Sequence, residues 1–328
     1  MLVVDDGCTD DTAAEVARWQ RVEGLNLRGL RSIGRQGRCL ARNRGLESAQ
    51  GALTVFLDGD ALPGPNLLEM YWDAFCANDA PTVLSGHQHH LPELEYAADP
   101  RTGSVTTGCE IPSVVKDLLV QRREEVVVTE AQVRSDFEAI RHRARPGSYP
   151  NDGTIRRQEE ARGLLQERPN STAGWLAFIP HNGAVATSLL RSAGGFDADI
   201  AFSEGWELAY RLQRYYGAVV RAVEADTYHL YHHHDFGDPS QVQARHAAVE
   251  YMAAKHRDPR IRLVYFWYAH LWADSFIPDE AVVKDLIEFD RLYQELPDTA
   301  WQQYEAVLRH HPNQFPLRNV EVNYESCA

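Results

Sequence analysis

Short apolar runs, each followed by acidic residues, mark the first third of the chain. Residues 1–4 are apolar and lead into an Asp-Asp-Gly turn at 5–7, and residues 52–57 are apolar and lead into Asp-Gly-Asp at 58–60. Both runs predict buried strands that end in turns, and residues 83–86 predict a third strand. The acidic residues therefore follow directly on strands.

Helical patterns alternate with these strands. Thr9 and Asp10 can cap a helix after the first strand, and residues 40–50 predict another helix that Gly51 ends. The alternation predicts an α/β fold, with a mostly parallel sheet covered by helices on both faces. Ligands of such sheets bind at the carboxyl ends of the strands, which is where both acidic turns fall.

The later part of the chain is largely helical in pattern. Residues 110–170 are charged and predict a helical insertion with a mobile loop, helical over about 114–143. Three further helical stretches are predicted, at 187–192, from about 205 to Gly217, and over 239–310. We therefore expect one domain over residues 1–238 and a helical extension over 239–328.

Aromatic residues gather in that extension, at Tyr265, Phe266, Trp267, Tyr268 and Trp272. Packing between helices is the interpretation that such a cluster favours, and stacking against a sugar is the alternative. The extension carries no motif, so it could equally cover an acceptor site or form a homodimer interface.

Composition narrows the classes of partner. The 328 residues include 44% hydrophobic and 24% charged residues, with a formal net charge of −14. The chain has no dominant basic stripe, which argues against nucleic acid. An anionic small molecule is still compatible, because a metal ion and a few arginines can hold it.

The five cysteines lack any paired or zinc-binding spacing: Cys8, Cys39, Cys76, Cys109 and Cys327. This pattern predicts free thiols in a reducing compartment. No apolar run is long enough for a transmembrane helix, and the first residues do not form a secretory signal. We therefore expect a soluble cytoplasmic protein.

Asp58 and Asp60 are the leading metal candidates. Two carboxylates one residue apart at a strand end can share Mn²⁺ or Mg²⁺ and so bring the cation to a phosphate. In sugar transfer such an ion neutralises charge on a departing nucleoside diphosphate. Taken alone, the Asp-x-Asp pattern is weak, because similar pairs occur in solvated turns.

The wider motif set resembles family 2 glycosyltransferases. The matching segments occur in the family's order: Val3–Thr12, Ala41–Gly45 with Ala49–Gly51, Asp58–Asp60, Gly194–Asp197, Glu207–Leu212 with Gly217, and Tyr228–His229. Bacterial chondroitin- and galactosyltransferase-type members look most similar. The resemblance covers roughly residues 1–235 and implies a GT-A fold, a Rossmann-like α/β arrangement.

The resemblance also implies roles for single residues. Asp5 and Asp6 would bind the donor, with Asp6 on the uracil of a UDP-sugar, and Arg42 would help to hold the pyrophosphate. Asp58 would lie near the ribose and the metal, and Asp60 would bind the metal directly. From the residues alone, Asp5 and Asp6 could simply cap a helix, and Arg42 could form a surface salt bridge.

Histidines complete the predicted metal site. By the resemblance, His229 matches the metal ligand that the family carries near the end of the domain. Among the neighbouring His232, His233 and His234, His232 is the second candidate. Adjacent residues of an extended chain point to opposite faces, so they cannot all bind one ion. A separate group, His87, His89 and His90, is interpreted as a solvated loop.

The match to the family is weakest at the catalytic base. Inverting members carry Glu-Asp ahead of a helix, whereas here Gly205 takes the place of the Asp. Glu204 is the best substitute and Glu207 the second, although either could instead stabilise the first turn of a helix. Both inversion and retention of configuration therefore stay open.

The acceptor is expected beside the same helix. By motif, the turn at Gly195 and Phe196 would border the acceptor hydroxyl. Trp206 could offer a flat face to an acceptor sugar or could lie in the core.

The resemblance also implies a strand, a loop and a helix ahead of Val3 that this sequence does not contain. Losing an inner strand would expose unpaired backbone groups. We therefore expect translation to begin upstream, with a strand from another chain or a damaged product as the alternatives.

Three functions are compatible with these residues. The first is transfer of a sugar from a nucleotide-sugar to an acceptor hydroxyl. The second is a non-catalytic sugar-nucleotide or carbohydrate-binding protein derived from the same fold, which Gly205 favours. The third is a nucleotidyltransferase, which uses similar carboxylate-metal chemistry. Metal-dependent turnover of a donor separates the first from the second.

Overall fold

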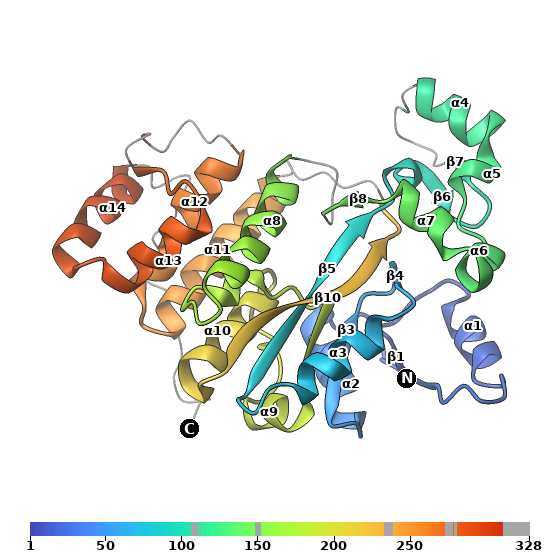
Figure 1. Ribbon diagram of the computed structural model, residues 1–328, viewed down its shortest axis with the longest axis horizontal. Coiled ribbons are helices and arrows are strands. Elements are labelled where there is room, and N and C mark those ends of the chain that lie inside the picture. The colour runs from blue at the N-terminus through green and yellow to red at the C-terminus, as the bar shows by residue number, and fades with distance from the viewer. Residues whose placement is uncertain are drawn as a thin grey trace.

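A computed structural model describes residues 1–105, 111, 113–147, 152–232, 239–272, 278 and 281–310. The chain forms an α/β fold in which helices surround a central six-stranded sheet (Figure 1). The predicted α/β class is confirmed. No described helix combines the length and the apolar character needed to cross a bilayer.

The central sheet has the strand order β3-β9-β5-β10-β4, with β8 added on β5. Its strands are β3 (Leu53–Leu57), β9 (Asn182–Ala186), β5 (Thr82–His90), β10 (Val219–His229), β4 (Ala61–Pro63) and β8 (Arg145–Pro146). β5 and β10 are the longest strands and run together through the middle of the molecule (Figure 1).

The expected mostly parallel sheet is wrong in one respect, because this sheet is mixed. β5 and β10 pair in parallel, but β9 runs antiparallel to both β3 and β5, and β4 runs antiparallel to β10. β3, β5 and β10 thus share one direction, and the reversed β9 separates β3 from β5. The apolar pattern of a buried strand does not encode its direction, so the sequence could not reveal this insertion.

A smaller parallel pair begins the chain. β1 (Leu2–Asp5) pairs with β2 (Arg28–Arg31), and α1 (Thr12–Trp19) connects them. The helix α2 (Arg38–Ser48) packs on β1, where Gly45 comes close to Val4. α3 (Leu67–Cys76) packs on β3, β5 and β10 through the buried Leu67 and Tyr71. The predicted strand 1–4, helix 40–50 and strand 52–57 are confirmed.

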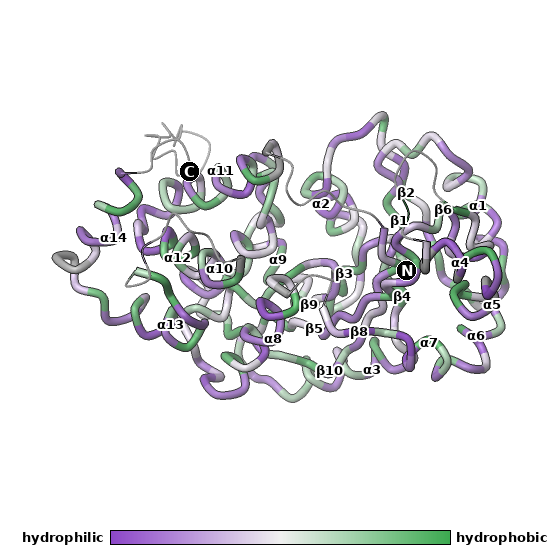
Figure 2. The backbone as a smooth tube through the Cα atoms, turned by 90° about the horizontal axis from the view of Figure 1, so that it is seen from above, coloured by the Kyte–Doolittle hydropathy of each residue, from purple (hydrophilic) through white to green (hydrophobic). Residues whose placement is uncertain are grey.

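The predicted helical insertion divides between two places. A hairpin of β6 (Ala97–Asp99) and β7 (Ser104–Val105) leads to four short helices, α4 (Ser113–Gln121), α5 (Arg123–Val126), α6 (Glu130–Ser135) and α7 (Phe137–Arg143). Both views place these helices at the same end of the molecule as α1 (Figures 1 and 2). α8 (Asp152–Glu167) lies instead with the carboxyl-terminal helices and contacts α12 and α13.

The main hydrophobic core joins the sheet to the carboxyl-terminal helices. It includes residues of η2 (Gly174–Ala177), β9 and α10 (Glu204–Tyr216), and it continues into α11 (Pro239–Lys255), α12 (Leu263–Trp272), α13 (Leu286–Glu295) and α14 (Asp298–His310). The boundary expected after residue 238 lies outside the described residues. Tyr265, Phe266 and Trp267 of α12 are almost completely buried. Core packing of these aromatic residues is therefore confirmed.

Two local predictions have different outcomes. α9 (Thr187–Ser192) is followed by Gly194 and Gly195, both with positive φ, and α10 ends at Gly217 in the left-handed conformation, as predicted. The prediction of a solvated loop at His87, His89 and His90 is wrong, because all three residues lie on β5. The strand reaches four residues beyond the predicted 83–86 because β10 continues to pair with it up to His229.

Candidate active site

Arg42 joins two of the predicted site carboxylates. It lies on α2, where its Nη2 donates to Asp58 Oδ1 at 2.9 Å and its Nη1 donates to Glu204 Oε1 at 2.7 Å. Asp58 follows β3, and Glu204 begins α10, so three separate elements meet at this guanidinium. Arg42 also stacks over the ring of Phe196, 5.4 Å from its centroid. The structure therefore brings Arg42, Asp58 and Glu204 into one group.

This group is largely withdrawn from solvent. The side chain of Glu204 is 7% exposed and that of Arg42 is 13% exposed, whereas Asp58 retains 39%. Partial burial raises the pKa of Asp58 above its ordinary value, although the Arg42 charge opposes the shift. Burial alone would lower the pKa of Arg42, but Asp58 and Glu204 raise it, so the guanidinium stays charged. A fixed cation here can attract phosphate oxygens.

Asp60, His229 and His232 form a compact cluster beside this group. Asp60 precedes β4, and His229 ends β10, where it pairs with Ala61 of β4. Asp60 Oδ2 lies 3.4 Å from His229 Nε2 and 3.2 Å from His232 Nε2. His229 is buried and His232 is half-exposed. The three side chains could hold one metal ion, since their ligand atoms lie within 4.8 Å of one another.

The donor set fits a divalent transition ion. Two ligands about 2.1 Å from one ion lie roughly 3.0–3.4 Å apart, close to the separations of both histidines from Asp60. Two imidazoles suit Mn²⁺ or a later metal better than Mg²⁺, which prefers oxygen ligands. Burial alone would raise the pKa of Asp60, yet the two histidines hold it well below its usual range. The carboxylate is therefore ionised, as a metal ligand must be.

Asp5 and Asp6 shape the loops around β1 and α2. Asp5 Oδ1 accepts from the backbone N–H groups of Gly7 and Cys8 at 3.0 and 2.7 Å. Asp6 accepts from the N–H groups of Gln36 and Gly37, directly before α2. The Asp6 carboxylate retains acceptor capacity beyond these bonds. Its predicted contact with the base of a nucleotide stays a prediction.

A steric clash explains why position 205 carries glycine in place of the expected Asp. A Cβ added to Gly205 would come within 2.3 Å of Pro180 Cδ and 2.9 Å of the Phe178 carbonyl oxygen. No side chain fits there unless this backbone moves. Glu204, in contrast, lies beside Arg42 and Asp58, and Arg38 Nε approaches its Oε1 at 3.7 Å. Of the carboxylates at the start of α10, Glu204 is the one in the group.

Glu207 belongs to a different network. Its fully buried carboxylate accepts from Arg211 at 3.0 and 2.9 Å and from Lys255 at 2.9 Å, and His256 Nε2 lies 3.2 Å away. Burial alone would raise the pKa of Glu207, but these partners hold it well below the ordinary value. The base role predicted for Glu207 gains no support from this position.

The predicted acceptor residues take part in packing. Trp206 is 4% exposed and contacts Trp175, Trp267 and Tyr268, so it lies in the core. Phe196 is also buried, with its ring edge-on to Phe56 at 5.1 Å. The alternative of core burial holds for Trp206.

Asn43 is a residue of this site to which sequence reasoning gave no role. Its side chain accepts from Phe196 N–H and donates to the Phe196 carbonyl, both at 2.7 Å. A Cβ on Gly195 would lie 2.4 Å from Asn43 Oδ1, so only glycine permits this approach. Asn43 thereby fixes the turn at Gly195 and Phe196 against α2. Asn43 follows Arg42 in the family-like segment Ala41–Gly45, and this position could have indicated a role.

His181 is a second unpredicted neighbour. Burial, together with the positive charges of Arg157 and Arg42, lowers the pKa of His181 to about 3. The ring is therefore neutral at ordinary pH. No sequence signal distinguishes this single histidine, which precedes β9.

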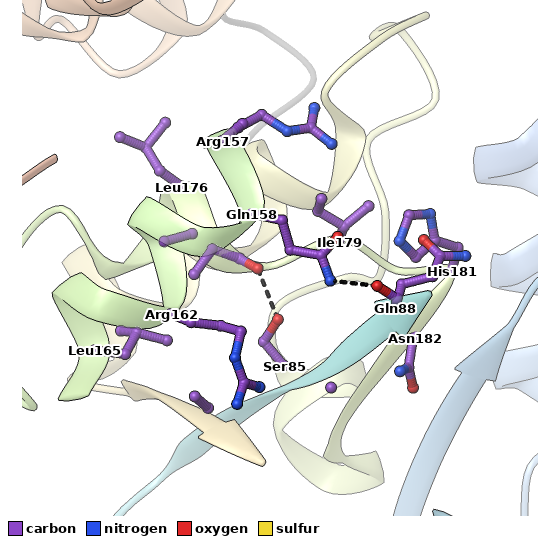
Figure 3. A pocket seen from close by; sticks show the side chains of 14 residues that line it. Ser85, Gln88, Arg157, Gln158, Arg162, Leu165, Leu176, Ile179, His181 and Asn182 are labelled. Atoms are coloured by element: carbon purple, nitrogen blue, oxygen red, sulfur yellow. Dashed lines mark hydrogen bonds between the residues drawn. The ribbon is translucent and has the colours of Figure 1, made fainter. Parts of the chain in front are cut away.

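A small cavity lies beside His181, between α8 and β5 (Figure 3). Gln158 reaches across it and donates to the backbone oxygen of Gln88 at 2.9 Å, and Ser85 donates to the Ala177 carbonyl at 2.7 Å (Figure 3). Its volume of about 20 Å³ has room for one water molecule but not for a sugar. The cavity is therefore not a substrate pocket.

The first part of the chain matches a known family model. Residues 1–102 match the model described as glycosyl transferase family 2. A glycosyltransferase of Haloferax volcanii, AglE, is 44% identical over 69 residues. That match spans 21% of this chain and only 22% of AglE, about a fifth of the length of this curated relative.

Three solved structures resemble the chain over most of its length. Residues 1–349 of TarS from S. aureus have 14% identity and a TM-score of 0.44, over 96% of this chain and 71% of that one. The mannosyltransferase PcManGT of Pyrobaculum calidifontis, in complex with GDP-Man and Mn²⁺, has 16% identity and a TM-score of 0.45. The match covers 94% of this chain and 64% of PcManGT. GalNAc-T7 with UDP, GalNAc and Mn²⁺ has 12% identity and a TM-score of 0.48. The match covers 96% of this chain and 52% of GalNAc-T7.

Proposed function

Because residues 1–102 match the model of glycosyl transferase family 2, we propose that the protein transfers a sugar from a nucleoside diphosphate-sugar to an acceptor hydroxyl. The observation that carries this proposal is the position of the Asp60-His229-His232 cluster beside the group of Arg42, Asp58 and Glu204. A cation site and a fixed guanidinium then lie together at the ends of β3 and β10, where a diphosphate needs charge compensation.

Asp60, His229 and His232 would hold the metal ion, with Mn²⁺ the favoured ion for this donor set. When bound, the ion supplies positive charge to the departing nucleoside diphosphate. Arg42 is oriented for the same oxygens because Asp58 and Glu204 fix two of its N–H groups. UDP is the favoured nucleotide, following the role proposed for Asp6.

Glu204 is the proposed general base. Its carboxylate is at the start of α10, in the group that borders the cation site, and it could accept the proton of an acceptor hydroxyl. Gly205 cannot supply this group, and Glu207 is bound by Arg211 and Lys255. The alternative role of Glu204 is to position Arg42, and variants of this residue separate the two roles.

Calorimetric titration of the full chain with UDP, with and without Mn²⁺, tests the donor site. We expect binding that requires Mn²⁺ and that is lost in Asp60→Ala. Asp73→Ala, which removes an exposed carboxylate on α3, is the matched control and should bind UDP normally. UDP binding that ignores both Mn²⁺ and Asp60→Ala would overturn the proposed site.

Turnover then separates an enzyme from a binding protein. With Mn²⁺ present, we expect the chain to release UDP from a UDP-sugar, and acceptor hydroxyls to accelerate the release. Metal-dependent UDP binding without turnover of any donor would instead support a non-catalytic sugar-nucleotide-binding protein.

A further inference from the structure

A second group of metal-ligating side chains lies on the β5–β10 strand pair. His87 and His89 are two residues apart on β5, so their side chains point to the same face of the sheet. Asp226 on β10 is the direct partner of His87 in the strand register. The pairing of two long strands therefore brings two imidazoles and one carboxylate together.

The distances within this group suit a single ion. Asp226 Oδ1 lies 3.5 Å from His87 Nδ1 and 3.3 Å from His89 Nε2. Two ligands bound to zinc at about 2.0–2.1 Å in tetrahedral geometry lie roughly 3.3 Å apart. All three ligand atoms lie within 4.8 Å of one another, so small side-chain rotations would place them around one ion.

The second group is separate from the proposed donor site. Asp226 and Tyr228 point to one face of β10, whereas His229 points to the other, because successive side chains of a strand alternate. The Asp60-His229-His232 cluster therefore lies on the opposite face of the same strands. The two groups share no residue, and neither needs the other to be filled.

The surroundings support a preformed site. The ring of His89 stacks on Tyr228 with 5.2 Å between centroids, and the Tyr228 hydroxyl accepts from Arg141 Nε at 3.3 Å. The His87 and His89 rings also contact each other, at 4.2 Å between centroids. The three ligand side chains retain 18–32% of their exposure, so an ion from solvent can reach them.

We propose that His87, His89 and Asp226 bind a Zn²⁺ ion, with water completing its coordination. Two imidazoles and one carboxylate form a typical zinc donor set, and three protein ligands leave one position open. The ion would join β5 to β10 on the face opposite the proposed donor site. This inference does not depend on sugar transfer.

Zinc titration of the tag-free, chelator-treated full chain tests this site. The double variant Asp60→Asn/His232→Gln weakens the other cluster and serves as the background. We expect this background to bind one Zn²⁺ per chain, and Co²⁺ at the same site to give the visible absorption of a tetrahedral ion. Adding His87→Gln and His89→Gln should abolish both signals.

Two controls keep the result interpretable. His310→Gln in the same background removes an exposed histidine of α14 and should retain the single Zn²⁺. Asp226→Asn serves as a second test if the paired histidine variant does not fold, and it should also lose the saturable site. Thermal unfolding with chelator present shows whether each variant is folded.

The proposal is overturned if the background binds no Zn²⁺ in a saturable manner. It is also overturned if folded chains lacking His87 and His89, or lacking Asp226, still bind one ion with unchanged affinity.

Discussion

Glu204 and Glu207 are three residues apart on α10, but they belong to two different charge networks. Glu204 meets Arg42 at the edge of the proposed cation site, and Arg42 also binds Asp58. Glu207 faces the core, where Arg211, Lys255 and His256 surround it. Lys255 also donates to Asp197 at 2.5 Å, so this inner network ties α11 to the turn after Gly195.

This difference separates the carboxylate proposed to act in catalysis, Glu204, from one that is buried among compensating charges, Glu207. The inner network consists of buried charges that compensate one another, so removing one leaves a buried neighbour with less compensating charge. The outer network lies beside the proposed metal cluster of Asp60, His229 and His232 and ends in a partly exposed Asp58. Changes at Glu204 should therefore alter turnover, and changes at Glu207 should alter stability.

The largest effect is expected from Glu204→Gln. If Glu204 is the base, this variant should lower kcat by about 10²- to 10⁴-fold, because an amide cannot take the acceptor proton. Its amide oxygen can still accept from Arg42, so stability should change little. Steady-state sugar transfer and thermal unfolding measure the two quantities.

Comparison with Glu204→Ala identifies the alternative role. If Glu204 only positions Arg42, the Gln variant should retain wild-type kcat and the Ala variant should lose activity. That outcome would contradict the proposed base.

Glu207→Gln should act on stability. We expect a loss of about 3–5 kcal/mol in the free energy of unfolding, because Arg211 would remain buried without its counter-charge and Lys255 would keep only Asp197. Denaturant unfolding measures this quantity. Glu224→Gln is the control, since Glu224 forms an exposed ion pair with Arg162 and should cost less than about 1 kcal/mol. Equal effects of both variants would contradict the structural role assigned to the buried Glu207.

Acid should reveal the same inner network. The pKa of Glu207 is lowered in the folded protein, so its contribution is complete above the unfolded value of about 4.3 and declines as the pH falls below it. The free energy of unfolding should therefore fall more steeply below about pH 4 in the wild type than in Glu207→Gln. Urea unfolding between about pH 6 and pH 3 measures both slopes. Parallel slopes would contradict the lowered pKa.

Gly205→Ala should have an intermediate effect. The new Cβ would press on Pro180 and the Phe178 carbonyl, and we expect a loss of about 1–3 kcal/mol in stability. Gly163→Ala is the matched control, because Gly163 lies in α8 with open space around its Cβ position. The control should stabilise the chain by about 0.5–1 kcal/mol. A neutral Gly205→Ala would contradict the steric reason for the missing Asp.

The smallest effect is expected from Arg38→Gln. The Arg38 side chain is 54% exposed and lies 3.7 Å from Glu204, so the pair should contribute less than about 1 kcal/mol. Sugar transfer should fall less than about fivefold. A larger loss would assign Arg38, as well as Arg42, to the outer network.

The sequence predicted the outer network and the neighbouring Asp60-His229-His232 cluster better than the inner network. Asp58, Asp60 and His229 stand in recognised motifs at strand ends, and the structure brings them to one region. Glu207 stands in a recognised motif too, but its burial depends on Lys255 and His256, which lie some fifty residues later. No local pattern links such distant residues. The clash at Gly205 likewise depends on Pro180 and could not be read from the motif.

The paired histidines of β5 show a signal that local reasoning could have used. In an extended strand, side chains alternate between the two faces of the sheet, so His87 and His89 would lie on one face. The predicted strand, however, ends at residue 86. The continuation depends on β10, whose pairing extends β5 to His90. A strand's length is set by its partner as well as by its own residues.

The reversed strand β9 also determines when the chain can fold during synthesis. β3 and β5 are made early, but the strand that lies between them arrives only with residues 182–186, and the second neighbour of β5 arrives with residues 219–229. Non-local pairing of this kind forms late. We therefore expect that residues 1–102, which carry the family match, do not fold on their own, and that β3 and β5 stay unpaired in the nascent chain until β9 and β10 have emerged.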